Sequence, residues 1–141
     1  MNQSRESGKD AAVVRWENHR VSFDLAVWEG DRPADNDEAA RVLDQLYAEL
    51  IASGKRIDPS PRIAAYVDGL LARWPDIGSK AEVDSPWSVG PLLTEASGPL
   101  IYFAMTYSSS RDLLREAIDY AVALAAERGL VCYDPQYGTL R

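Results

Sequence analysis

The stretch Gly98 to Tyr107, GPLIYFAMTY, constrains the fold more than any other part of the chain, because it is apolar or aromatic on both of its alternating faces. This pattern is typical of an interior strand of a sheet. Ser97, Gly98 and Pro99 provide turn chemistry immediately before it. We therefore expect a central strand here, with the remaining elements built around it.

Apolar periodicity along the rest of the chain predicts three helices and three more strands. A capping box at Asp35 and Glu38 starts the first helix, and Ser60 followed by Pro61 starts the second. Pro91 cannot donate a hydrogen bond to a ladder, so the strand that contains it belongs at an edge. In chain order, the predicted elements are a strand at 21–28, helices at 35–53 and 60–74, the edge strand at 87–95, the central strand, a helix from 108–110 to 129 and a strand at 130–133.

This order, β-α-α-β-β-α-β, predicts an α+β domain with the ferredoxin-like split βαβ arrangement. The expected sheet has four strands, is antiparallel or mixed, and has its helices on one face. Right-handed crossovers would place the first and third strands side by side and parallel in the middle. The strand with Pro91 then lies at one edge and the last strand at the other.

Length and cysteine content set the expected organisation. A chain of 141 residues suits one domain, so we expect a single α+β domain at 21–141 after a disordered or loosely packed lead-in at 1–20. Cys132 is the only cysteine, which excludes an internal disulfide and a multi-cysteine metal site. No apolar run of about 18 residues is present, so we expect no membrane span and a location in the cytoplasm.

The formal charge of -7 limits the choice of partners. An acidic surface repels phosphate backbones, so no nucleic-acid partner is expected. The charge indicates either simple solubility or a basic protein partner.

Period-two alternation assigns the strand side chains to two faces, one toward the helices and one carrying a carboxylate among hydroxyls and aromatic rings. The candidate binding residues of this second face are Asp24, Trp28, Tyr102, Thr106 and Tyr133, with Trp87 either bordering the face or filling a loop pocket. The Asp24 carboxylate would accept a hydrogen bond from a donor group of a small ligand or a partner, and the aromatic rings would supply flat apolar area for contact. The alternative is an ordinary solvated face or a homodimer interface.

The sequence predicts no catalytic residue, no cofactor and no metal site. His19 is the only histidine and lies in the lead-in, so we do not expect it to pair with Cys132, which suits a buried strand position. Asp24 with Asp134 or Glu95 is the one carboxylate pair that acid and base chemistry could use near one end of the sheet. The sequence contains no glycine-rich phosphate loop and no glycine-flanked nucleophilic serine.

Two segments resemble small uncharacterised bacterial proteins, namely FDLAVWEGDRP at Phe23 to Pro33 and GLVCYDPQ at Gly129 to Gln136. The PRI sequence from Pro61 and the SPW sequence from Ser85 resemble the middle of the same family. The resemblance covers most of 23–136 and implies no activity for any residue. By analogy with small acidic α+β immunity proteins, it suggests a surface that covers a basic site on a toxin.

Together these features predict a non-catalytic domain that binds a protein partner, in the manner of an immunity protein, or a second copy of itself. The alternative is a small-ligand-binding domain or a small enzyme that uses the face around Asp24, Trp28, Tyr102 and Tyr133.

Overall fold

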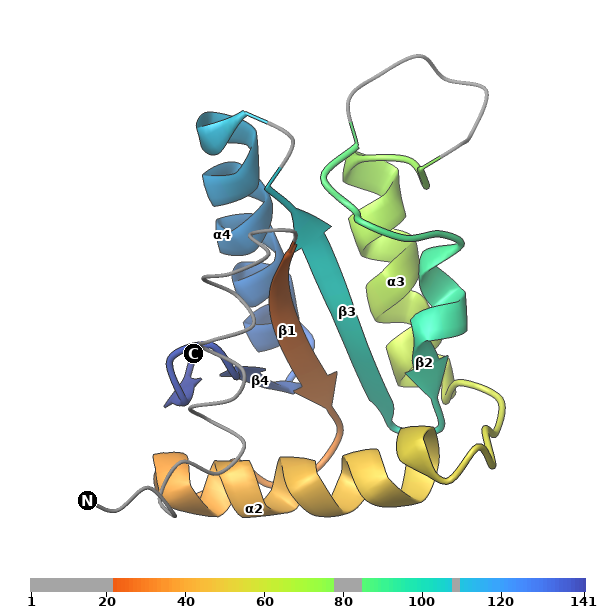
Figure 1. Cartoon of the computed structure of the whole chain (residues 1–141), viewed down its shortest axis with the longest axis vertical. Helices are drawn as coiled ribbons and strands as arrows, with labels where there is room; N and C mark the ends of the chain where they lie inside the picture. Colours follow the sequence, from red (N-terminus) through yellow and green to blue (C-terminus); the bar gives the residue numbers. More distant parts are fainter. Residues whose placement is uncertain (1–21, 78–84, 108–109) are drawn as a thin grey trace, which may run out of the picture.

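β1 (Ser22–Trp28) is the middle strand of the sheet and has a neighbour on each side (Figure 1). The computed structural model describes residues 22–77, 85–107 and 110–141, so the predicted lead-in at 1–20 lies outside the described residues. β3 (Leu100–Thr106) pairs with β1 along its whole length, and β4 (Val131–Asp134) pairs with the second half of β1. Two short strands, β2 (Ala96–Ser97) and β5 (Thr139–Leu140), complete the order β2-β3-β1-β4-β5.

All neighbouring strands are antiparallel, which corrects the prediction that the first and third strands are parallel. Figure 1 shows the reason: the chain runs down β1, back along α3 (Pro61–Arg73) and down again before it enters β3. It reverses at Gly98, whose φ of +55° suits a residue without Cβ. The sheet also has five strands instead of four, because the tail folds back on β4 as β5.

The predicted edge strand at 87–95 is replaced by two short paired pieces on either side of a 3₁₀ turn, η3 (Leu92–Glu95). Trp87 forms an isolated bridge with Met105, and the Ser88 N–H donates to the Ala104 carbonyl oxygen over 3.0 Å. The chain then leaves the ladder after Ser88 and pairs with β3 again only as β2. Pro91 lies between the two paired pieces, at the start of η3, so the predicted strand that contains it is not formed.

The predicted helix starts are confirmed by their capping hydrogen bonds. Asp35 accepts from the Glu38 N–H over 2.8 Å at the start of α2 (Asn36–Tyr47), which continues into a π-helical turn, η2 (Ala48–Ala52). Ser60 caps α3 and Ser110 caps α4 (Arg111–Glu127), each through its hydroxyl oxygen. Serine and aspartate are favoured at helix N-caps because their side-chain oxygens accept hydrogen bonds from N–H groups that have no partner within the helix.

The helices lie on both faces of the sheet, so the prediction of helices on one face is wrong. α3 and α4 cover the larger core, and the buried strand side chains of this core are Phe23, Leu25, Val27, Ile101, Phe103, Met105 and Cys132. α2 lies across the lower end of the strands in Figure 1, and its Ala39 and Leu43 pack in a second cluster with Trp28 and Tyr133. The second face needs this cover because Trp28, Leu100 and Val131 make it apolar at that end.

No helix in the described part of the chain is both long enough and apolar enough to span a bilayer.

Candidate functional site

The sheet face expected to bind a ligand is filled by the protein itself at its aromatic end. Trp28 is 1% exposed and Tyr133 is 5% exposed, because α2 packs on both side chains. Their ring centroids lie 6.4 Å apart at a tilted angle. The two rings therefore stabilise the packing of α2, and they do not present flat area to a ligand.

Tyr133 lies close to the carboxylates of α2. Burial raises the pKa of the Tyr133 hydroxyl, and the negative charges of Asp44, Asp134 and Asp37 raise it further. The Tyr133 hydroxyl therefore lies within electrostatic range of two carboxylates of α2.

Asp24 lies at the other end of this face, where polar groups surround it. Its carboxylate accepts from the Ser22 hydroxyl over 3.1 Å and from the Tyr102 hydroxyl over 3.3 Å. The Asp24 side chain is 5% exposed, while Tyr102 and Thr106 are partly buried. The structure thus brings Asp24 and Tyr102 together, as the alternation predicts, but among other side chains of the protein.

Gln136 is the residue of this region that the sequence analysis missed. Its side-chain oxygen accepts from the Asp24 N–H over 2.6 Å, and its amide group donates to the Asp24 carbonyl oxygen over 2.9 Å. The same amide donates to the Asp134 carboxylate over 2.8 Å. Gln136 therefore continues the ladder between β1 and β4 beyond the last paired residue, with a side chain in place of a backbone.

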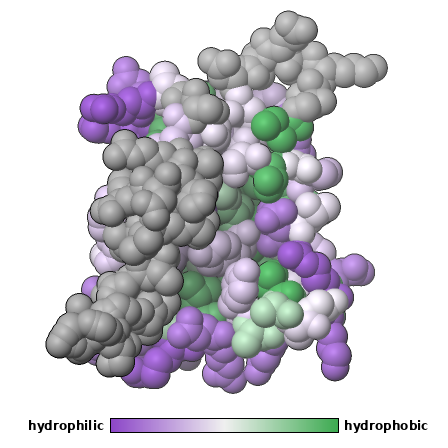
Figure 2. All heavy atoms as spheres, in the orientation of Figure 1, coloured by the Kyte–Doolittle hydropathy of each residue, from purple (hydrophilic) through white to green (hydrophobic). Residues whose placement is uncertain are grey.

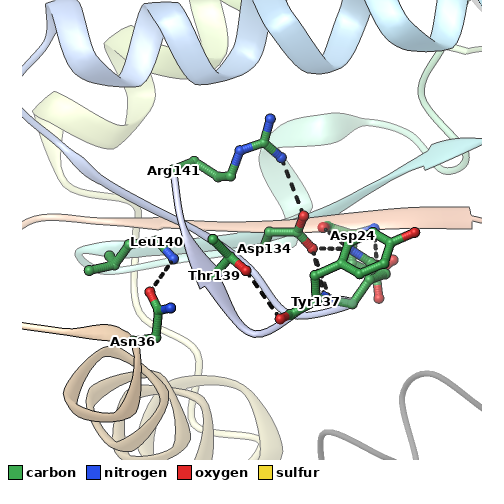
Figure 3. Close-up of polar contacts among 8 residues, drawn as sticks. Asp24, Asn36, Asp134, Tyr137, Thr139, Leu140 and Arg141 are labelled. Carbon is green, nitrogen blue, oxygen red and sulfur yellow. Dashed lines mark hydrogen bonds and ion pairs between the residues drawn. The ribbon is translucent and has the colours of Figure 1, made fainter.

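The Asp134 carboxylate organises the turn between β4 and β5 (Figure 3). It accepts from the backbone N–H groups of Gln136 and Tyr137, and from the Arg141 guanidinium over 3.3 Å. Asp134 is 2% exposed, so these hydrogen bonds offset the cost of burying its charge. The carboxylate pair considered for acid and base chemistry, Asp24 and Asp134, is close in space, but both members are held by structural hydrogen bonds. Glu95 belongs to η3, before β2 at the opposite edge of the sheet.

Trp87 lies on the sheet face opposite to Asp24. It is fully buried, and its indole N–H donates to the Trp74 carbonyl oxygen over 2.9 Å. Its ring meets those of Trp74 and Phe103 edge to face, at centroid distances of 6.0 and 6.1 Å. Trp87 therefore belongs to the core under α3, because the bridge to Met105 turns its side chain toward that face.

Cys132 has the properties of a core residue. Its side chain is 3% exposed, and burial raises the pKa of its thiol to about 12. A thiol with this pKa stays protonated near neutral pH and is a poor nucleophile. His19, its only imidazole candidate partner, lies outside the described residues. The described part of the chain also contains no group of three or more His, Cys, Asp or Glu side chains arranged to hold a metal ion.

The acidic charge is concentrated on α2 and the loop before it. Residues 29–53 contain seven acidic and two basic side chains, a net charge of -5 against -7 for the whole chain. Asp37, Asp44 and Glu49 are exposed, and no ion pair joins them to a basic side chain among the residues described. Figure 2 shows hydrophilic atoms along the lower edge of the molecule, where α2 lies. We call Asp37, Asp44, Tyr47 and Glu49 the α2 surface.

An aromatic side chain lies within this acidic region. Tyr47 is 38% exposed, and its ring meets Tyr102 edge to face at a centroid distance of 5.3 Å. Tyr102 thus anchors one side of Tyr47 while the other side faces solvent. An exposed, partly anchored tyrosine next to charged residues is typical of protein interfaces.

The chain was compared with protein-family models, with curated proteins and with solved structures, and none of them matches it.

Proposed function

We propose that this protein is a non-catalytic domain that binds a basic protein partner through the α2 surface. The carrying observation is that residues 29–53 hold a net charge of -5, and that Asp37, Asp44 and Glu49 form no ion pair among the described residues. Exposed carboxylates without ion pairs create a negative potential at the surface, which suits a function in which a basic partner neutralises them.

The core packing behind the α2 surface supports this function. Ala39 and Leu43 fix α2 on Trp28 and Tyr133, so the carboxylates on its outer side are held on a rigid element. Charges that are fixed in position steer a partner of opposite charge and raise its association rate. Tyr47 supplies an aromatic contact at the end of the same helix.

The alternative function, a ligand site or small enzyme on the sheet face, has less support. Trp28 and Tyr133 are covered by α2, and the Asp24 carboxylate already accepts two hydrogen bonds. A homodimer through these aromatic residues is disfavoured for the same reason. If a second copy binds, the α2 surface would repel its own equivalent.

We also propose that the domain has a ferredoxin-like arrangement and is located in the cytoplasm. The order β2-β3-β1-β4, in which α4 connects β3 to β4 around β1, supports a ferredoxin-like arrangement with β5 added. The single cysteine supports a location in the cytoplasm.

The test is the kinetics of association with a basic partner, isolated on the immobilised protein and then measured over a salt series. Asp37→Lys with Asp44→Lys should slow association by at least about tenfold at low salt and flatten the salt dependence. We leave Glu38 unchanged because its carboxylate accepts from the Ala34 N–H and caps the helix.

The matched control is Asp68→Lys with Glu127→Lys, which changes the net charge equally at exposed positions on α3 and α4. The control should retain most of the association rate of the unmodified protein. Equal slowing by both double variants would mean that only net charge matters, and the α2 surface would lose its assigned role.

A further inference from the structure

A groove of about 370 Å³ lies on the side of the sheet that α4 covers, away from the α2 surface. It forms because α4 has 17 residues, roughly 25 Å in length, while β4 has four residues, roughly 13 Å. The first half of α4 therefore extends past the end of β4 and has no strand beneath its outer side. Phe23, Leu114 and Ile118 form the apolar part of the lining.

Three arginines surround this apolar lining in a chain that is otherwise acidic. Arg111 and Arg115 lie one turn apart on α4, and Arg141 follows β5 on the opposite wall. Figure 3 shows the Arg141 side chain on the α4 side of the sheet, where it reaches toward Asp134. Arginines from two distant parts of the sequence thus line the same groove with positive charge.

The positive charge of the groove exceeds its negative charge. Arg141 neutralises Asp134, which leaves Arg111 and Arg115 against Asp119. The side chains of Arg111 and Arg115 have no ion pair or hydrogen bond within the described part of the chain, although Asp119 lies four residues after Arg115. Arg111 is also the first residue of α4, where the helix dipole is positive.

We propose that this groove binds a small organic anion, with a carboxylate or phosphate group between the arginines and a flat apolar body on Phe23, Leu114 and Ile118. Guanidinium groups recognise both kinds of oxyanion through paired N–H donors, and Arg141 keeps further donors while it contacts Asp134. The volume of this open groove is at the lower end of the range for small-ligand sites. This inference is independent of the proposed function, because the groove and the α2 surface lie on opposite faces of the sheet.

The test uses four probes on the purified full chain: 1-naphthyl phosphate, 1-naphthoate, 1-naphthol and inorganic phosphate. Calorimetry and amide chemical shifts report binding and its location. We expect a dissociation constant of about 0.1 mM for at least one of the two naphthyl anions, with naphthol and inorganic phosphate at least about tenfold weaker. The stronger of the two anions identifies which acid group the groove prefers.

Arg115→Gln should weaken binding of that anion by about tenfold, because it removes one charge-assisted contact from an exposed and unpaired position. Arg128→Gln is the matched control, since Arg128 is exposed at the other end of the same helix and lies outside the groove. The control should change the dissociation constant by less than about twofold, as should the α2 double variant Asp37→Lys with Asp44→Lys.

Three results would overturn the inference. They are the absence of binding for both naphthyl anions, equal weakening by Arg115→Gln and Arg128→Gln, and shift changes confined to residues outside α4 and 134–141. Failure of partner binding at the α2 surface would leave these measurements unaffected, so the two proposals fail separately.

Discussion

Gln136 provides both hydrogen bonds that a longer β4 would have given to Asp24. A primary amide carries one acceptor and two donors, so it can pair with a backbone N–H and a backbone C=O at the same time. Gln136 is 5% exposed, and its hydrogen-bond partners Asp24 on β1 and Asp134 on β4 are also buried. A single side chain therefore joins the turn after β4 to the start of β1.

Gln136→Ala should lower the free energy of unfolding by about 2–4 kcal/mol, because three buried polar groups lose their partner. The groups are the N–H and C=O of Asp24 and the carboxylate of Asp134. Urea unfolding measures the loss. The control Gln45→Ala removes an exposed amide with one long contact to Glu49, and it should cost less than about 0.5 kcal/mol. Similar losses for both variants would contradict the structural role of Gln136.

Cys132 should make stability depend on pH in the alkaline range. Its folded pKa of about 12 lies above its ordinary value of 9.0, so the folded state holds the proton more tightly than the unfolded state does. The stabilisation is complete below pH 9 and is lost as the pH rises toward 12. The buried hydroxyl of Tyr66, whose pKa is also raised by burial, acts in the same direction.

Urea unfolding at pH 7, 9 and 10.5 tests this dependence. The unmodified protein should lose stability between the two higher values, with a contribution from Cys132 of up to about 1.4 kcal/mol per pH unit. Cys132→Ala should be less stable at pH 7 and should show a smaller loss above pH 9. Parallel curves for the two proteins would exclude a contribution from the thiol.

At the scale of elements, Trp87 connects three parts of the fold. Its backbone bridges to β3, its indole N–H binds the carbonyl at the end of α3, and its ring packs between Trp74 and Phe103. The segment 85–88 is thereby held at the sheet edge although its ladder is only one bridge long. Removing this anchor should loosen the edge and the end of α3 together.

Trp87→Phe should destabilise the protein by about 2–4 kcal/mol, because it leaves a cavity and an unpaired Trp74 carbonyl. Thermal unfolding by circular dichroism measures the loss. Val89→Ala in the same segment is the control, since Val89 is 44% exposed and should cost less than about 0.5 kcal/mol. A loss no larger than that of the control would show that Trp87 does not anchor the edge.

The helices, their caps and the longer strands were predictable from the sequence because they depend on local chemistry. Asp35, Ser60 and Ser110 satisfy their own helix starts, so the nearby sequence contains the whole signal. The side of the sheet that α2 covers was not predictable. An apolar stripe shows which side of a helix is buried, but it does not show which face of the sheet that side covers. The one available signal was the central strand, whose apolar second face required cover.

The candidate sites depend on contacts between distant residues, and sequence patterns do not report those. Alternation correctly placed Asp24 and Tyr102 on the same face, but Gln136 reaches Asp24 across 112 positions of sequence. The groove similarly arises from the unequal lengths of α4 and β4. Arg141 becomes a neighbour of Arg111 and Arg115 only after both elements have packed.

At the scale of the whole molecule, the uneven distribution of charge should govern the response to salt. Like charges on residues 29–53 repel one another at low ionic strength, and added salt screens this repulsion. We expect the free energy of unfolding to rise by about 0.5 kcal/mol between 20 and 200 mM NaCl. The double variant Asp37→Lys with Asp44→Lys should show less than half of this rise.

The charge-matched variant Asp68→Lys with Glu127→Lys should keep most of the salt response, because its changes lie on other helices. Urea unfolding at each salt concentration provides the comparison. An identical response in both double variants would assign the effect to net charge and not to the α2 surface.

The shortness of the outer strands also bears on how the molecules behave in a crowded solution. β2 and β5 have two residues each, and the chain before β2 is out of the ladder from Val89 to Glu95. A strand from another molecule would therefore find only a few adjacent backbone groups to bind on either side. Long unpaired strands are templates for edge-to-edge aggregation, and this sheet exposes none in its described part. We therefore expect the short, interrupted edges of this sheet to limit edge-to-edge pairing between molecules.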